Sequence, residues 1–236
     1  MSPLDHIFSN VLQVQTEDDL RKEMVAFAKR IGFDYVTILC AVGQVNGEHK
    51  QFALNNYPET WDANNPENLK RDPIVAKLKS LRARPTPVLW GPELYQATDT
   101  MDLWESASAH GFHSGIATPI LTTPHKRVLV GLSRDKALDN DLRVVQHQVG
   151  ELCLFTSFAQ LVVDRIFDLD RLIPSLTRRE LECLQWTVEG KTAGEVAIIL
   201  SMSERTANFH LQNAMKKLGA ANKYQAAMRA AQYGLL

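Results

Sequence analysis

The hydrophobic positions in the first part of the chain predict a helix followed by two strands. Residues 18–31 place apolar side chains at three- and four-residue spacings, which indicates an amphipathic helix, and Thr16 can cap its first turn. Residues 33–42 are rich in aromatic and β-branched types and predict a strand. A polar turn separates this strand from residues 51–55, so we expect a second strand that pairs back onto the first.

The middle of the chain predicts short helices and strands, followed by one long helix. Helices are expected over 72–79, 101–110 and 142–167, and strands over 88–90, 115–121 and 127–133. The last two strands flank a turn that contains a proline, which favours a hairpin. This order predicts an α+β class, with an N-terminal α/β/α sandwich in which helices cover both faces of an antiparallel sheet.

The last part of the chain changes to a purely helical pattern of four short helices. Capping residues open each of them: Thr177 with Glu180, Thr192 with Glu195, Ser203, and Asn222. Only residues 201–203 separate the second helix from the third, which is the tight connection of a helix-turn-helix. We therefore expect an N-terminal domain over 1–167, a proline-containing linker over 168–175, and a four-helix, all-α helix-turn-helix domain over 176–236.

The third of these helices carries different residues on its two sides. An apolar stripe that includes Ala207 runs along one side, while Asn208, Gln212 and Lys216 recur at four-residue spacing on the other, with Arg205 near the start. Amide side chains can bond two atoms of an adenine edge, and Arg and Lys bind guanine or phosphate. This composition fits a recognition helix in the major groove, although the solvated face of a generic helical bundle would look similar.

The charge of the chain is divided unevenly between the two parts. The formal net charge is -1, but basic residues outnumber acidic ones by three after residue 175, so the rest carries an excess of acidic residues. A basic domain on an acidic body indicates a polyanionic partner. The start of the chain lacks the pattern of a secretory signal, and no run reaches the roughly 18 apolar residues of a membrane span, so we expect a cytoplasmic protein.

Cysteine and histidine spacing does not favour a metal or a disulfide framework. Cys40, Cys153 and Cys183 are odd in number and far apart, which is typical of reduced thiols. His110 and His113 lie three residues apart with no cysteine nearby, and Asp102 and Glu105 lie on the helix expected before them. We expect no metal and no cofactor.

Residues of the helical domain recur at the spacing of a known family. They are Leu176, Thr177, Arg179, Glu180, Trp186, Gly190, Lys191, Thr192, Glu195, Val196, Ala197, Leu200, Ser203, Thr206, His210, Asn213, Lys217, Leu218, Asn222 and Lys223. This pattern resembles the LuxR-type helix-turn-helix. The resemblance implies a homodimer that binds double-stranded DNA at an inverted-repeat operator.

The resemblance and the helix pattern together give a set of expected DNA contacts. The expected residues are Lys191, Thr192, Arg205, Thr206, Asn208, Gln212, Lys216, Lys217 and Lys223. Of these, Lys191, Thr192, Lys216 and Lys223 are expected on phosphates. A further set of small residues, Ala226, Ala227, Ala230 and Ala231, gives the last helix a face that we expect to pack against a second copy.

A second series of residues resembles the autoinducer-binding domain of quorum-sensing regulators. The series comprises Tyr57, Pro58, Trp61, Asp72, Pro73, Trp90, Trp104, Glu105, Ala107, Gly111, Gly115 and Pro119. The resemblance implies an acyl-homoserine lactone as the small-molecule ligand. Trp61 would then bind the ring carbonyl, Tyr57 the acyl carbonyl and Asp72 the amide N–H, with Trp90 as a wall and Ser133 as a further contact.

Some residues of this series also have purely structural interpretations. Tyr57 and Trp61 can be packing residues, and Asp72 can cap a helix that starts at Pro73. Residues 62–71 are fewer than the family usually has there and lack its tyrosines, which leaves room for a different acyl tail or ligand class. Phe52 is expected near the tail.

The sequence thus predicts a ligand-responsive transcription regulator of quorum sensing. Two alternatives stay open, a sensor of a non-lactone signal and a ligand-independent regulator of the same architecture. An enzyme is not expected, because the segment around Ser133 lacks the second glycine of the G-x-S-x-G nucleophile motif.

Overall fold

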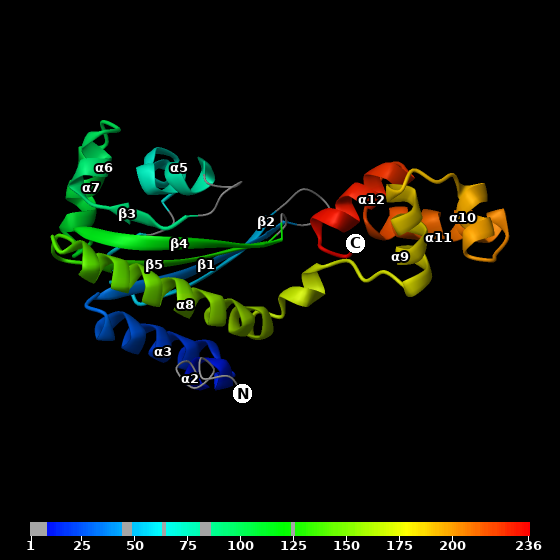
Figure 1. The fold of residues 1–236 in the computed structure, drawn as a ribbon. Coiled ribbons are helices and arrows are strands. Elements are labelled where there is room, and N and C mark those ends of the chain that lie inside the picture. Colours follow the sequence, from blue (N-terminus) through cyan, green and yellow to red (C-terminus); the bar gives the residue numbers. More distant parts are fainter. Residues whose placement is uncertain (1–8, 44–48, 63–64, 81–85, 124–125) are drawn as a thin grey trace. The chain divides into compact units, whose positions relative to one another are not determined.

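The computed structural model describes residues 9–43, 49–62, 65–80, 86–123 and 126–236 (Figure 1). The chain divides into two compact units, of which the first contains most residues up to Asp168 and the second contains Leu169–Leu236. The first unit combines helices with strands, whereas helices form the second from Leu169 onward. This confirms the predicted α+β class with an all-α C-terminal part.

One antiparallel sheet of five strands forms the centre of the first unit. Its strands are β1 (Tyr35–Gly43), β2 (His49–Asn55), β3 (Val88–Trp90), β4 (Ser114–Thr123) and β5 (Lys126–Arg134), in the order β2-β1-β5-β4-β3. β3 pairs antiparallel with β4, which places Trp90 opposite Gly115. The predicted strands and both predicted hairpins are confirmed.

Helices lie on both faces of this sheet (Figure 1). One face carries α3 (Glu17–Arg30) and α8 (Leu142–Ile166), and the short α2 (Ser9–Gln13) packs against both of these helices. The other face carries α5 (Pro73–Ser80), α6 (Pro92–Gln96) and α7 (Met101–Ser108). The predicted α/β/α sandwich is therefore confirmed.

Alternation along β1 separates the two faces of the sheet. Val36, Ile38 and Cys40 are almost completely buried on one face. Because side chains of a strand alternate, Tyr35 and Thr37 point to the other face, where the Tyr35 ring lies 4.7 Å from the Phe112 ring between centroids. The sheet therefore has one aliphatic face and one aromatic and polar face.

Polar caps fix several helix starts, and three short helices, α2, α4 (Pro66–Arg71) and α6, were not predicted from the sequence. The Thr16 hydroxyl accepts a hydrogen bond from Asp19 N at 3.2 Å at the start of α3, as expected. Of the unexpected helices, α4 and α6 each begin with a proline, which suits the first helical turn. Each has at most six residues, which is too short for a hydrophobic period to show.

From Leu169 onward, the second unit contains a short 3-10 turn, η2 (Leu169–Leu172), and four helices. These are α9 (Arg178–Val188), α10 (Ala193–Ile199), α11 (Glu204–Lys217) and α12 (Lys223–Gln232). Thr177 and Thr192 form the two predicted capping boxes, and Ser203 and Asn222 cap α11 and α12. Gly190, with φ of +79°, ends α9 in a left-handed conformation that suits glycine.

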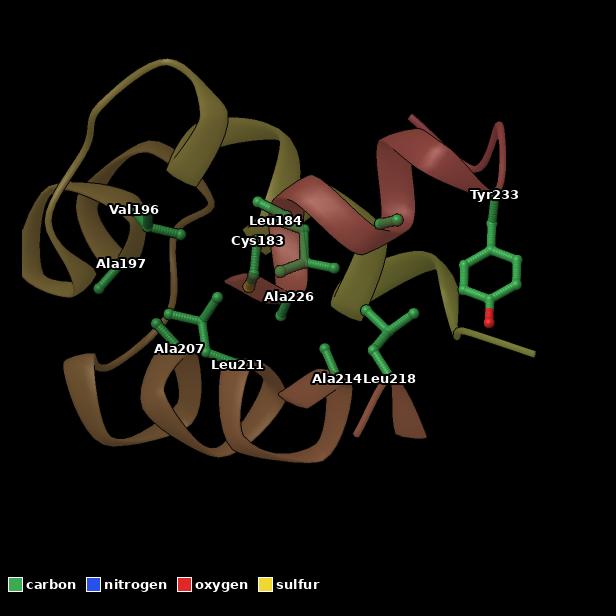
Figure 2. Close-up of a cluster of buried hydrophobic side chains, with 12 residues drawn as sticks. Cys183, Leu184, Val196, Ala197, Ala207, Leu211, Ala214, Leu218, Ala226 and Tyr233 are labelled. Carbon is green, nitrogen blue, oxygen red and sulfur yellow. The ribbon is translucent and has the colours of Figure 1, made fainter. Parts of the chain in front are cut away.

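The core of the second unit includes three of the four alanines of α12. Ala226, Ala227 and Ala230 are buried among residues such as Leu184 and Leu218 (Figure 2). These three side chains are buried in the core of a single copy. The expectation that they form a face for a second copy is therefore wrong. The spacing of the alanines correctly predicted a small-residue face on α12, but this face packs within the same unit and not against a second copy.

Among the described residues, no helix is both long enough and apolar enough to cross a bilayer.

Because Gly115 on β4 has no side chain, the ring of Trp90 can pack closely against the backbone at this position. A Cβ added at Gly115 would overlap the Leu132 carbonyl oxygen and lie 2.6 Å from Trp90 Cε2 and Cζ2. We expect Gly115→Ala to destabilise the first unit by about 1–3 kcal/mol, because neither the backbone nor the packed ring can move away easily. Urea denaturation of the full chain, followed by circular dichroism, measures the change.

Gly150, in the middle of α8, is the matched control. A Cβ added there meets nothing within 4 Å, so Gly150→Ala is expected to stabilise the protein by up to about 1 kcal/mol through helix propensity. Equal effects of the two substitutions would contradict the close approach of Trp90 to β4.

Candidate functional site

An aromatic cluster fills the space between the sheet and the helices α5, α6 and α7. Trp90, Tyr95, Ala107 and Phe112 are its buried members. Partly buried apolar residues pack around them: Tyr35, Tyr57, Trp61, Ile74, Leu94, Met101, Leu103 and Trp104. Three of the predicted ligand contacts, Tyr57, Trp61 and Trp90, are therefore in one cluster.

Tyr57 follows the end of β2 and is a half-buried member of this cluster. The centroid of its ring lies 6.3 Å from the ring centroid of Tyr35 and 4.9 Å from that of Phe112. Burial raises the pKa of the Tyr57 phenol to about 12; a hydrogen bond with Thr37 opposes this rise, and the negative charge of Asp72 adds to it. The phenol is consequently a protonated hydrogen-bond donor at neutral pH.

Asp72 links the cluster to the start of α5. Its Oδ1 accepts hydrogen bonds from Ile74 N at 2.7 Å and Val75 N at 3.3 Å, so it is the helix cap that the structural interpretation expected. Burial raises the pKa of the Asp72 carboxyl, although these two hydrogen bonds lower it. Both bonds use Oδ1, which leaves Oδ2 as an acceptor.

Tyr95, on α6, is a polar member of the cluster that the sequence did not predict. Burial raises the pKa of its phenol, and the charge of Asp72 and the neighbouring Tyr57 add to the rise. Tyr57, Asp72 and Tyr95 therefore act on one another electrostatically. Alternation along β1 places Thr37 on the same face of the sheet as Tyr35, which the period-two pattern of the sequence could have indicated, and its hydrogen bond with Tyr57 joins it to the cluster.

Trp61 and Trp104 use their indole rings differently. The Trp61 ring lies 5.2 Å from the His110 ring and 5.1 Å from the Phe112 ring, and no hydrogen bond of its N–H is found among the described residues. Trp104 Nε1 donates to the His113 carbonyl oxygen at 2.9 Å. The Trp61 N–H is therefore available to a ligand, whereas the Trp104 N–H ties α7 to the segment before β4.

Ser133 lies on the same face of the sheet as Thr37. A Cβ added at Gly131 would lie 3.1 Å from Thr37 Cγ2, so position 131 faces Thr37, and the alternation of β5 places Ser133 on that face too. Phe52 lies elsewhere: its ring is 4.9 Å from the ring of Phe167, which follows α8. The expectation that Phe52 lies near an acyl tail is therefore wrong.

The residues of this cluster can together hold a small ligand with a polar head. An indole N–H and a phenol O–H can donate to carbonyl oxygens, and a carboxylate can accept from an amide N–H. The aromatic surroundings suit an apolar remainder. Among the described residues no group of three or more metal-ligating side chains is found.

The predicted recognition face of α11 is open to solvent. Its exposed predicted residues are Arg205, Thr206, Asn208, Gln212 and Lys216. The stripe on the opposite side, Ala207, Leu211, Ala214 and Leu218, is buried as expected. The structure therefore brings the predicted base-reading residues onto one surface.

The other predicted DNA contacts have partners within the unit. Lys223 Nζ donates to the Lys191 carbonyl oxygen at 3.2 Å, and the Thr192 hydroxyl takes part in the capping box of α10. Lys217 Nζ lies 2.8 Å from Glu180 Oε2 in an ion pair. Of these residues, Lys217 has the strongest structural role, and its DNA contact stays a prediction.

Glu180 is a buried carboxylate that connects α9 to α11. Burial alone would raise its pKa, but hydrogen bonds from Lys217 Nζ and Thr177 N outweigh this effect and lower the pKa below its ordinary value. The carboxylate is therefore stabilised in its charged form by α11.

Comparison with known families matches both parts of the chain. The family described as "Autoinducer binding domain" matches residues 16–163, and the family described as "Bacterial regulatory proteins, luxR family" matches residues 174–230. The transcriptional activator protein AnoR of Acinetobacter nosocomialis is 35% identical over 243 residues, which cover 98% of each chain. The regulatory protein SdiA of Escherichia coli K12 is 31% identical over 230 residues, which cover 95% of this chain and 92% of SdiA.

Solved structures of SdiA have the same fold. A crystal structure of Escherichia coli SdiA superposes with a TM-score of 0.74 at 28% identity and covers 98% of this chain and 97% of that chain. A structure of SdiA in complex with octanoyl-rac-glycerol superposes equally well and covers 94% of that chain.

The Glu180–Lys217 pair predicts different effects for two neighbouring lysines. We expect Lys217→Met to destabilise the second unit by about 1–3 kcal/mol at neutral pH, because a buried carboxylate loses its cation. Lys216→Met, at an exposed position, is expected to stay within about 0.5 kcal/mol. Hydrogen exchange of α9 and α11 amides in the full chain under increasing urea measures both.

The pH dependence checks the sign of this interaction. The pKa of the Glu180 carboxyl is lower in the folded state than in the unfolded state, where it is about 4.3. The charged carboxylate therefore stabilises the fold at pH values above the unfolded-state pKa, and this contribution is lost as the pH falls through the folded-state pKa. The difference between wild type and Lys217→Met should thus be largest above about pH 5 and shrink below about pH 4. A difference that grows in acid would rule out the assigned pair.

Proposed function

Because this chain belongs to the LuxR family of bacterial regulatory proteins and carries an autoinducer-binding domain, we propose that it responds to an acyl-homoserine lactone. The chain is a ligand-responsive, DNA-binding transcription regulator of quorum sensing, in a family of transcription regulators. The lactone, the homodimer, the inverted-repeat operator and a cytoplasmic location are parts of the proposal. So is the division into a sensor domain over 1–167, a linker over 168–175 and a DNA-binding domain over 176–236.

The observation that carries the ligand proposal is the grouping of Tyr57, Trp61 and Trp90 in one aromatic cluster, with the Asp72 carboxylate close enough to act electrostatically on the Tyr57 phenol. In the proposed complex the Trp61 N–H donates to the ring carbonyl, the Tyr57 O–H donates to the acyl carbonyl, and Asp72 Oδ2 accepts from the amide N–H. Trp90 covers the head group, and Ser133 lies on the same face of the sheet as a further contact. An amide donor beside Asp72 favours its charged form, so ligand binding would lower its raised pKa.

Ligand binding and DNA binding are connected through stability in this proposal. A ligand that binds the folded state alone adds about 2.7 kcal/mol at one hundred times its dissociation constant. The occupied sensor then supports a homodimer, whose paired recognition helices read two half-sites about one helical turn, or a multiple of it, apart.

A non-lactone acyl signal is a second candidate for the same cluster. SdiA, a relative of similar fold, has been solved in complex with octanoyl-rac-glycerol, which has an acyl chain but no lactone ring. The glycerol head lacks an amide N–H but has hydroxyl groups, which can donate to Asp72 Oδ2 in its place. The two classes are therefore distinguished by which ligand stabilises the protein, not by the contribution of Asp72.

Thermal unfolding of the full chain with acyl-homoserine lactones of increasing chain length tests the ligand proposal. A saturating lactone should raise the Tm of the wild type by about 5–10 °C. Trp61→Phe and Asp72→Asn should each reduce this rise, because each removes one contact to the head; Asn retains the ability to cap α5.

Trp104→Phe is the matched control, because its N–H bonds within the protein. It should lower the Tm of the free protein and leave the rise with lactone unchanged. A rise with octanoyl-rac-glycerol and none with any lactone would favour the non-lactone signal, and no rise with either would favour the ligand-independent alternative.

The salt dependence of DNA binding tests the predicted phosphate contacts. Lys216→Met should weaken binding of the full chain to duplex DNA and reduce the slope of log affinity against log salt concentration by about 1, because one phosphate contact is lost. Fluorescence anisotropy with labelled duplexes at several salt concentrations provides the slope. An unchanged slope would remove Lys216 from the interface.

A further inference from the structure

Phe209 is a large apolar side chain in the middle of the solvent-exposed face of α11. It is 58% exposed, although phenylalanine normally gains stability from burial. Nine residues, or two and a half helical turns, separate it from the buried Leu218, so the two side chains lie on opposite sides of the helix. Phe209 therefore points directly away from the core that holds α11 in place.

The neighbours of Phe209 on this surface are the predicted DNA-reading residues. Arg205 lies one turn before it, Asn208 precedes it directly, and Gln212 lies three residues after it; all three are exposed. Phe209 belongs to the second turn of α11, and the N-terminal part of a recognition helix is the part that contacts base edges. The apolar ring is thus surrounded by groups that bind bases and phosphates.

The chemistry of this surface restricts what can cover the ring. Arg205 and Lys216 give it positive charge and Asn208 and Gln212 give it amide groups, which suits a polyanion with hydrogen-bonding base edges. The apolar group that duplex DNA presents in the major groove is the C5-methyl of thymine, and phenylalanine is among the side chains that contact it.

We propose that Phe209 is a specificity-determining residue that contacts a thymine methyl group in each half-site of the operator. This inference rests on the proposed placement of α11 in the major groove. Asn208 and Gln212 read hydrogen-bonding edges, while Phe209 reads the presence of one methyl group. It adds a preference for thymine that none of the polar residues of the face provides.

Removal of the methyl group from the DNA tests the contact directly. Binding sequences are first selected from random duplexes with the full-length protein, with and without octanoyl-homoserine lactone. Each thymine of the selected duplex is then replaced by deoxyuridine, which lacks only that methyl group. One replacement per half-site removes two methyl groups from the duplex and should weaken wild-type binding about fifteenfold, because each buried apolar carbon contributes about fourfold.

The variants of the protein complete the test. Phe209→Ala should lose the preference for thymine over deoxyuridine at that position, and Phe209→Leu should keep part of it because leucine is apolar. Met228→Ala, which shortens another exposed apolar side chain, should behave as the wild type does at every thymine.

Two results would overturn the proposal in distinguishable ways. If wild type and Phe209→Ala respond equally to every deoxyuridine, Phe209 is not the methyl reader, while base reading by α11 stands. If the wild type selects no sequence under either condition, base reading by α11 fails as well, and the proposed DNA recognition fails with it.

Discussion

A five-stranded sheet with two unlike faces is the constraint on which the first unit depends. Both faces have to be covered, because the strands alternate apolar side chains to either side. On the aliphatic face α3 and α8 provide long, regular cover, with Phe27 stacked on Phe155. On the aromatic face three helices of at most eight residues do so. Two long helices thus cover one face of the sheet, and three short helices cover the other.

The fold was largely predictable because its local signals agree with its packing. The capping residues located α9 to α12 almost to the residue, since a cap hydrogen bond depends only on neighbours in sequence. The short helices α4 and α6 gave no periodic signal. The alanines of α12 gave a clear pattern, but which neighbour covers a small-residue face is decided by the tertiary structure, and here the neighbours include Leu184 and Leu218.

The candidate site was predictable in membership but not in geometry. Family spacing selected Tyr57, Trp61 and Trp90, which the structure gathers into one cluster. It did not indicate that Thr37 forms a hydrogen bond with Tyr57, or that Lys217 forms an ion pair with the buried carboxylate of Glu180. Such pairings join residues distant in sequence, and a single sequence contains no direct signal for them. The exposed position of Phe209 was not predicted for another reason. An apolar residue in a helix is first interpreted as part of a core.

If Asp72 binds the ligand as proposed, its carboxylate has two roles, and this has an evolutionary consequence. One oxygen caps α5 through Ile74 N and Val75 N, and this task is open to aspartate, asparagine, serine and threonine alike. The other oxygen accepts neither of these bonds and is the one proposed to accept from the head group of the ligand, where its charge and acceptor strength would select the head group. Substitutions among these four residue types can therefore alter the recognised signal while the helix keeps its cap, so that a descendant lineage can acquire a new signal without first passing through an unfolded sensor.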